Sequence, residues 1–393
     1  MRPSGLAFRT LLKVILFCCM AIATRVAHSG FSGGHSLLHQ MHRRNFLGRF
    51  GLLFASPLLR AQRSNSVDPV PDESIAEAAK GFLAALRPEL RRLSQLAFDD
   101  PKRKDWSNLP HYIHPRKGLR LGDLTPQERA AAHRLLQAIL SSQGYYKATA
   151  IMAVDDFLGA ASDQSRQQYG SEYYFLDVFG EPGGDAPWGV QIDGHHLAVN
   201  VTVVDHRVTM TPAHFGADPA VLPSGRHAGW QVLGGETAKG FALRNALTPE
   251  QTRRAVLSET LPPDIFTLPG RDNELKTPAG VNALAGQQRD LLESLVDEYV
   301  GNLRIEVGRA YRTAIQSAGF DKLHFAWMGP AEIGKAVYYR IHGPTLLIEY
   351  DAIVPPNTKL PNDPNHIHTV LRVPGNDFGE DWLRRHHQEH HQK

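Results

Sequence analysis

Two glycine-bounded segments of this chain repeat one another at a fixed spacing, and this repeat constrains the fold more than any other feature. Gly180 and Gly194 are 14 residues apart, and so are Gly329 and Gly343. Aromatic and β-branched residues precede the second glycine of each pair, over 188–192 and 337–341, which is typical of paired strands. Such strands also recur by chance, but the matched spacing favours a duplicated β-hairpin.

A pair of helices is predicted ahead of each hairpin. Apolar residues recur at helical spacing over 125–158 before the first hairpin and over 283–317 before the second. The first helix starts with a capping box, in which Thr125 is the N-cap, Pro126 takes the first helical position and Glu128 follows three residues after the cap. The same order of elements therefore precedes each hairpin.

The sequence thus predicts an α+β fold. We expect two similar helix-helix-strand-hairpin units, at about 122–246 and 280–379, with an antiparallel sheet and a pseudo-twofold duplication. Together they would form a single globular domain over 74–385. A polar linker at 62–73 precedes this domain, and a His-rich tail at 386–393 follows it.

The first 61 residues are predicted to be targeting sequence. Arg43 and Arg44, followed by Asn-Phe-Leu, resemble the twin-arginine export consensus. An apolar run at 50–59 follows and ends near Ala61, a suitable cleavage point. Twin-arginine export carries proteins that fold before crossing, often around a cofactor, and this raises the expectation of a bound metal or cofactor.

A second apolar stretch, at 11–23, lies upstream of this signal. Because tandem signals are unusual, we expect Met41 to be the true start and 1–40 to be translated upstream sequence. The alternative is a membrane anchor at 11–23. The protein is therefore predicted to be periplasmic or secreted, and membrane-anchored if 11–23 is retained; no span is predicted in the mature chain.

The leader also carries the positive charge and the cysteines. The chain has 43 Lys and Arg against 40 Asp and Glu, but 1–67 contain nine of the basic residues and none of the acidic ones. The remainder has a net charge of −6, so no nucleic-acid partner is predicted. Cys18 and Cys19 both precede the cleavage point, which excludes a disulfide, a thiolate metal site and a cysteine nucleophile in the mature chain.

The densest polar cluster follows the second hairpin and predicts a metal site. His366 and His368 alternate along a predicted strand, so both imidazoles point to one face. Glu349 lies on a predicted neighbouring strand. Two histidines and a carboxylate suit a first-row metal with open positions, so we predict one divalent transition metal held by His366, His368 and Glu349. The alternative is that these groups form structural hydrogen bonds and ion pairs.

Further residues could act on or bind a substrate. Asp351 and His342 are the candidates for general base or acid. Of the adjacent His195 and His196, which would face opposite sides of a strand, the polar neighbours of His196 favour it as a site residue. The residues predicted to bind a small, anionic or sugar-like ligand are Arg340, Arg372, His196 and Tyr339, with Trp188, Trp327 and Tyr338 beside them.

Five motifs together resemble one bacterial family, that of domain of unknown function 3500. They are Pro187-Trp-Gly, Gly194-His-His-Leu-Ala-Val-Asn, Tyr338-Tyr-Arg-Ile-His-Gly-Pro, Ile348-Glu-Tyr-Asp and Asn365-His-Ile-His-Thr-Val. The resemblance covers about 84–390. The family pattern has Arg-Asp after the His-X-His strand, where this chain has Arg372 and Val373. The resemblance implies an uncharacterised globular domain and no particular reaction.

Three functional hypotheses remain open from the sequence. The leading one is an exported metal-dependent hydrolase or oxidoreductase acting on a small molecule. The second is a metal-free periplasmic protein that binds a small anionic or sugar-like ligand between the two units. The third is a structural domain without a small-molecule site.

Overall fold

The computed structural model describes residues 72–353 and 364–390, within a compact unit that spans 62–393. The predicted signal, start codon, cleavage site and anchor at 1–61 lie outside the described residues. So does most of the predicted linker. No helix in the described part of the chain is long and apolar enough to cross a membrane.

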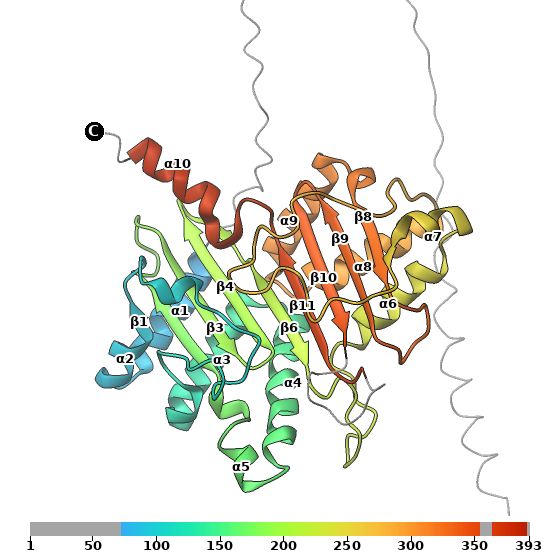
Figure 1. Cartoon of the computed structure of the whole chain (residues 1–393). Helices are drawn as coiled ribbons and strands as arrows, with labels where there is room; N and C mark the ends of the chain where they lie inside the picture. The colour runs from blue at the N-terminus through green and yellow to red at the C-terminus, as the bar shows by residue number, and fades with distance from the viewer. Residues whose placement is uncertain (1–71, 354–363, 391–393) are drawn as a thin grey trace, which may run out of the picture. The chain divides into compact units, whose positions relative to one another are not determined.

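One eleven-stranded sheet runs through this unit (Figure 1). Its strands are β1 (Gln95–Leu96), β2 (Phe175–Phe179), β3 (Trp188–Gly194), β4 (Leu197–Val204), β5 (Arg207–Thr209), β6 (Ala213–Ala217), β7 (Val256–Ser258), β8 (His324–Met328), β9 (Val337–Gly343), β10 (Leu346–Ala352) and β11 (Ile367–Arg372). The order is β1-β2-β3-β4-β6-β11-β10-β9-β8-β7, and β5 pairs with β4. The central pair, β6 and β11, therefore joins the N-terminal strands to the C-terminal ones.

The sheet is mixed, which corrects the expectation of an antiparallel one. Pairings from β2 across to β8 are antiparallel, but β1 runs parallel to β2 and β7 runs parallel to β8. Each of these outer pairs is separated along the chain by helices, and such a crossover permits parallel pairing. Two-residue turns close the β3–β4 and β9–β10 hairpins, so the predicted hairpins are confirmed.

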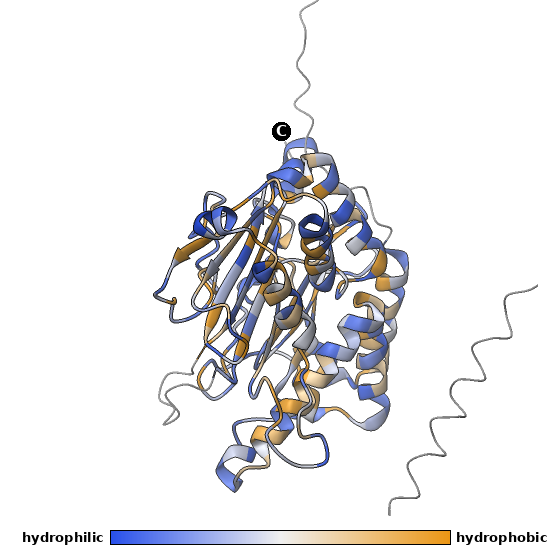
Figure 2. Ribbon diagram, turned by 90° about the vertical axis from the view of Figure 1, so that its right-hand side faces the viewer, coloured by the Kyte–Doolittle hydropathy of each residue, from blue (hydrophilic) through white to orange (hydrophobic). Residues whose placement is uncertain are grey.

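Helices gather on one side of the sheet (Figure 2). The α-helices of the described residues are α1 (Glu73–Ala85), α2 (Pro88–Ser94), α3 (Pro126–Ile139), α4 (Ser142–Gly159), α5 (Asp163–Arg166), α6 (Gly234–Asn245), α7 (Pro249–Ala255), α8 (Gln287–Val300), α9 (Ile305–Ala318) and α10 (Glu380–His390), the last of which lies at the upper end of the sheet in Figure 1. The predicted capping box of α3 is confirmed, with Glu128 and Thr125 bonding each other's backbone N–H. Hydrogen bonds from Arg87 and Thr125 overcome the opposing effect of burial and lower the pKa of Glu128 to about 2.

The two faces of the sheet differ in chemistry. Alternate residues of β3 and β4, such as Ile192 and Val199, enter the main hydrophobic core beside the helices. The residues between them, such as Asp193 and Asn200, are equally buried but polar. Two long connections, 97–125 and 259–286, cover this polar face and supply its partners. The sheet thus holds a buried polar layer away from solvent, and this layer contains the candidate site.

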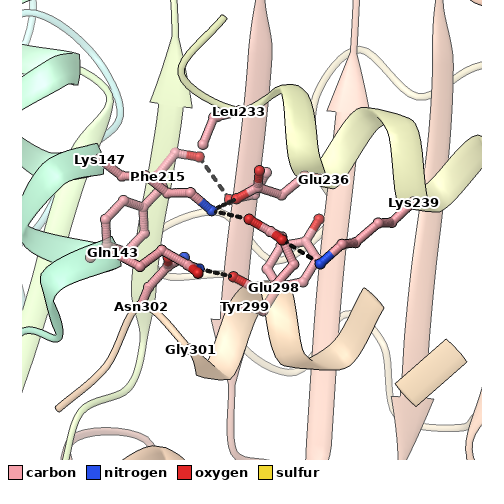
Figure 3. Close-up of polar contacts among 12 residues, drawn as sticks. Gln143, Lys147, Phe215, Leu233, Glu236, Lys239, Glu298, Tyr299, Gly301 and Asn302 are labelled. Atoms are coloured by element: carbon pink, nitrogen blue, oxygen red, sulfur yellow. Dashed lines mark hydrogen bonds and ion pairs between the residues drawn. The ribbon is translucent and has the colours of Figure 1, made fainter. Parts of the chain in front are cut away.

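A buried ion-pair network links α4 to α6 and α8 on the helical side (Figure 3). The Lys147 ammonium lies 2.7 Å from a Glu236 oxygen and 2.6 Å from a Glu298 oxygen. Lys239, which is partly exposed, lies 2.5 Å from the other Glu298 oxygen. Because α4 precedes the first hairpin and α8 precedes the second, this network connects the two halves of the unit.

Part of the His-rich tail predicted at 386–393 lies within the described residues. Helix α10 runs through that position to His390, and Trp382 and His386 are both buried. The His386 Nδ1 atom lies 2.6 Å from the Asp205 carboxylate. His386 therefore packs against the β4–β5 turn.

Candidate metal centre

Three imidazoles converge at one end of the polar face. The Nε2 atom of His366 lies 2.7 Å from the Nε2 atom of His196 and 2.9 Å from that of His368. These side chains form one of two groups in the described residues that could hold a metal ion. Nitrogens bound to one tetrahedral zinc ion lie about 3.3 Å apart, so the imidazoles would need to open by about half an ångström.

Proton counting favours a metal over mutual hydrogen bonds. His368 Nδ1 lies 2.8 Å from the Asp264 carboxylate, which can only accept, so Nδ1 carries the hydrogen and donates it. If the ring is neutral, its Nε2 atom then has a lone pair. The single Nε2 hydrogen of a neutral His366 cannot then serve His196 and His368 equally well. A metal ion, by contrast, would accept lone pairs from all three rings.

The fold brings these rings together through backbone geometry. His196 occupies the turn between β3 and β4 with φ 62°, in the left-handed region. His366 immediately precedes β11, and His368 lies on it, beside β6. Gly216 on β6 makes room for the His196 ring, because a Cβ atom there would lie 2.9 Å from His196 Cδ2. The centre is thus assembled where the N-terminal and C-terminal strands meet.

We predict that Gly216→Ala weakens metal binding by displacing the His196 ring. A Cβ atom would also lie 2.8 Å from the Ile367 carbonyl oxygen. Because the backbone of β11 is rigid, the new methyl group cannot move towards it, and the His196 ring must move instead. The expected loss of affinity is about 10-fold, measured by competition with a chelator. Gly81→Ala, whose Cβ would meet nothing within 4 Å, is the control. Equal affinities for the two variants would contradict this prediction.

Asp264 and Asn108 complete the surroundings of His368. Each comes from one of the two long connections that cover the polar face. The Asn108 side-chain amide donates to the Asp264 carboxylate at 3.3 Å, and the Asn108 main-chain carbonyl oxygen accepts from the His196 backbone N–H at 3.2 Å. A carboxylate on the distal nitrogen of a histidine fixes the ring and makes it a better ligand.

Electrostatics keep most of these rings neutral, as metal ligands must be. Burial lowers the pKa values of His196 and His366 well below the usual range, and neighbouring imidazoles lower them further. Burial also lowers the pKa of His368, but Asp264 and Asp351 outweigh it, so the net shift is upward. A dication would compete with the extra proton on His368.

Asp351, a predicted general base or acid, lies beside the centre in the second group that could hold a metal, with Asp264 and His368. One oxygen accepts the His368 backbone N–H at 3.1 Å, and the other is buried without a partner among the described residues. Burial raises the pKa of this carboxyl well above its usual range. Asp351 can thus contribute a protonated carboxyl group or a further metal ligand.

A second histidine–carboxylate pair borders the centre. His195 Nδ1 lies 2.6 Å from Asp155 on α4, and its ring centroid is 3.8 Å from that of His196. Since His195 and His196 form a turn rather than a strand, they do not face opposite sides as expected. Tyr169 lies against His195 at 5.3 Å, and Tyr112 lies 5.6 Å beyond it. This row of rings leads from the surface to the centre.

Two other predicted site residues on the polar face lie apart from the imidazoles. Glu349, the predicted third ligand, accepts hydrogen bonds from Tyr338, from Thr267 and from the Phe266 N–H. The structure therefore groups His196, rather than Glu349, with the two other histidines. His342 is in register with Leu347, four residues before Asp351 on β10, or about 13 Å along the strand.

The predicted ligand-binding residues do not form one cleft. Arg372 is committed to Asp377 and Asp272, at 2.7 Å each. Tyr339 lies on the helical face, stacked on Tyr350 with centroids 4.5 Å apart. Trp188 and Trp327 belong to that core as well. Arg340 lies on the polar face of β9.

The comparisons with known proteins agree with the sequence motifs. The model of the DUF3500 family, described as a protein of unknown function, matches residues 68–380. The chain belongs to the DUF3500 family. No curated protein and no solved structure matches it. Family membership therefore identifies relatives of this DUF3500 protein but assigns no reaction, and the chemistry rests on its own side chains.

Sequence reasoning missed Asp264, Asn108 and Asp155. Asp264 and Asn108 lie in irregular connections, where no periodicity indicates which way a side chain points. The one usable signal is the Pro262-Pro263-Asp264 run, because consecutive prolines mark a rigid loop that could present an aspartate. Asp155 follows helical spacing like its neighbours, so nothing local distinguishes it.

Proposed function

We propose that this DUF3500 protein is a metal-dependent enzyme whose centre activates water to hydrolyse a small molecule. The observation that carries the proposal is the convergence of the His196, His366 and His368 Nε2 atoms, with Asp264 behind His368. Three protein ligands leave a fourth position for water or substrate, as in catalytic zinc sites. Neutral ligands leave the full charge of the dication to lower the pKa of that water to about 7.

Nearby groups support proton transfer at such a centre. Asp155 accepts the Nδ1 hydrogen of His195, which leaves Nε2 as the basic atom of that ring. The raised pKa of Asp351 suits a carboxyl group that donates a proton to a leaving group. We therefore propose His195 as general base and Asp351 as general acid, in place of the sequence-based pair of Asp351 and His342.

A redox reaction is the second candidate, favoured by the row of rings that ends at His196. Centroids 5.6, 5.3 and 3.8 Å apart connect Tyr112, Tyr169, His195 and His196. An electron could pass along such a row if the metal were copper or iron, both of which accept imidazole ligands. The identity of the metal in the purified protein distinguishes the two candidates, since zinc has no redox chemistry.

The open coordination position is tested with cobalt. Replacing the native ion by Co²⁺ should produce the visible absorption of a four-coordinate site, and adding azide should change that spectrum. An unchanged spectrum, or one typical of a closed six-coordinate ion, would remove the case for metal-activated water. The companion assay compares hydrolysis of p-nitrophenyl acetate by metal-loaded and metal-stripped protein.

We predict that Asp264→Asn lowers metal affinity by about 10–100-fold, the usual effect of losing the carboxylate behind a ligating histidine. The amide keeps the volume but can present its NH₂ group to His368 Nδ1, which disturbs the ring orientation. Chelator competition measures the affinity. Asp163→Asn, at a carboxylate whose side chain is 95% exposed, should leave it unchanged.

We also propose that the two halves arose by duplication and that the protein is exported by its twin-arginine signal. The sheet order supports the first idea, since β1-β2-β3-β4-β6 and β7-β8-β9-β10-β11 occur in mirrored order about the centre. Helix α6 packs on α8 much as α1 packs on α3. The repeats would then span about 73–217 and 234–372 rather than 122–246 and 280–379.

The proposal of export by the twin-arginine signal is tested by cell fractionation after Arg43→Lys, Arg44→Lys substitution.

A further inference from the structure

The β9–β10 hairpin carries buried polar atoms without partners. Arg340 is 6% exposed and His342 is 3% exposed, and both side chains project from the polar face of β9. Neither Arg340 Nε nor His342 Nδ1 has a hydrogen-bond partner in 72–353 and 364–390, and the Thr345 hydroxyl in the adjoining turn has none either. Native structures contain few such groups, so a cluster of them indicates a place where an external hydrogen-bonding partner can bind.

Arg340 differs in this respect from the other buried lysines and arginines. These cations all have carboxylate or carbonyl partners: Lys102 with Asp177, Arg116 with Asp193, Lys147 with Glu236, Arg372 with Asp377, and Arg103 with the Phe98 carbonyl. Within the described residues, Arg340 forms no ion pair. A buried charge without a counter-ion costs several kcal/mol, and the other four buried cations apart from Arg103 have a carboxylate beside them.

The equivalent hairpin in the N-terminal half shows what is absent. At the offset of 149 residues, Gln191 and Asp193 on β3 correspond to Arg340 and His342. Gln191 contacts the Lys102 ammonium at 2.9 Å, and Asp193 contacts the Arg116 guanidinium at 2.6 Å. The 97–125 connection thus supplies a partner at both positions, whereas the 259–286 connection leaves Arg340 Nε and His342 Nδ1 without one.

The carboxylate opposite Arg340 on the neighbouring strand already accepts hydrogen bonds from other groups. Glu349 is in register with Arg340, but its oxygens accept from the Phe266 and Thr267 N–H groups at 2.8 and 2.9 Å. The Tyr338 hydroxyl donates to Glu349 at 2.7 Å and stands between that carboxylate and Arg340. The Arg340 guanidinium therefore retains donors that an external acceptor can use.

We propose that Arg340 and His342 bind a small oxyanion, a carboxylate or a phosphate group. Arginine presents a planar set of N–H donors that matches such oxygens. Burial lowers the pKa of His342 to about 4, with Arg340 adding to the effect, so its neutral ring can offer one N–H to the same anion. The site is separate from the metal centre and does not depend on the proposed reaction.

Thermal unfolding of the full chain tests the site. Phosphate or acetate is added at matched ionic strength, with chloride as reference, to protein stripped of metal by a chelator. Saturation should raise the unfolding midpoint by about 5 °C. A response to phosphate alone identifies a phosphoryl ligand, and a response to acetate alone a carboxylate. Equilibrium dialysis of the unmodified chain against phosphate or acetate measures the same binding without a variant.

Arg340→Gln should abolish the shift and unfold no earlier than the parent in chloride, because it removes an uncompensated buried charge. Arg271→Gln, at an exposed arginine paired with Glu274, should keep the full shift. A shift that survives Arg340→Gln, or no binding of either anion by both methods, would overturn the proposal. So would a shift seen only in metal-loaded protein, which would place the anion at the metal.

Discussion

Replacing His366 and His368 together with alanine is expected to remove the metal from the purified protein. Two of three ligating nitrogens are lost, and the remaining His196 ring cannot hold a dication alone. The fall in affinity should exceed about 100-fold, the upper end of the effect of losing an outer-shell partner. Elemental mass spectrometry of protein folded in a twin-arginine-competent host measures the content.

The control separates this centre from adventitious binding by surface histidines. His227 is exposed, lies beside Trp230 and belongs to neither of the two groups that could hold a metal, so His227→Ala should retain the metal. Circular dichroism must show that the double variant is folded; the single variant His366→Ala, at a half-buried position, serves if it is not. A folded, metal-free parent protein would refute the metal centre and leave ligand binding as the function to pursue.

Lys147→Met is expected to cause the largest loss of stability, about 3–5 kcal/mol. The lysine is buried between Glu236 and Glu298, and methionine keeps the length but not the charge. Glu236 is fully buried, so its ionised form would be left without a counter-ion. Urea unfolding at neutral pH measures the change, and parallel slopes show that it concerns stability alone.

Lys239→Met is the matched control, because Lys239 contacts the same Glu298 from a partly exposed position. Its expected cost is below about 1 kcal/mol, as for other exposed pairs. A Lys239→Met variant as unstable as Lys147→Met would show that burial of the lysine does not decide the cost.

The Lys147→Met substitution should also change how the stability of the protein depends on pH. Burial raises the pKa of Glu236, whereas hydrogen bonds from Lys147 and Lys239 outweigh burial and lower that of Glu298. Without Lys147, the folded state of the variant binds a proton on Glu236 more readily than the unfolded chain does. The variant should therefore lose more stability than the parent as pH rises from 5 towards 8.

Part of the site was predictable because period-two alternation is a local property. His366 and His368 were assigned to one face from their spacing, and the structure groups them. His196 was selected for its polar neighbours, although it lies in a turn. Tyr339 shows the limit of this reasoning, because alternation states which residues share a face but not which face meets the helices.

The convergence of His196 on the other two histidines was not predictable, because it depends on which strands are neighbours. His196 meets β11 only because β6 pairs with β4 on one side and with β11 on the other. Glu349 is nearer in sequence and lies on an adjacent strand, yet the 259–286 connection claims its oxygens. The contact is not predictable from the residues near Glu349 in the sequence, because its partners Phe266 and Thr267 lie more than 80 residues away.

By itself, the sequence determined the local elements: the hairpins, the capped helix at Thr125, the shared face of the two histidines and the membership of the DUF3500 family. Only the tertiary structure decided the mixed strand order, the convergence of His196 on His366, and the pairing of Asp264 with His368. The physical reason is range. Turn chemistry and side-chain alternation act between near neighbours, whereas the centre depends on contacts between residues 104 to 170 positions apart.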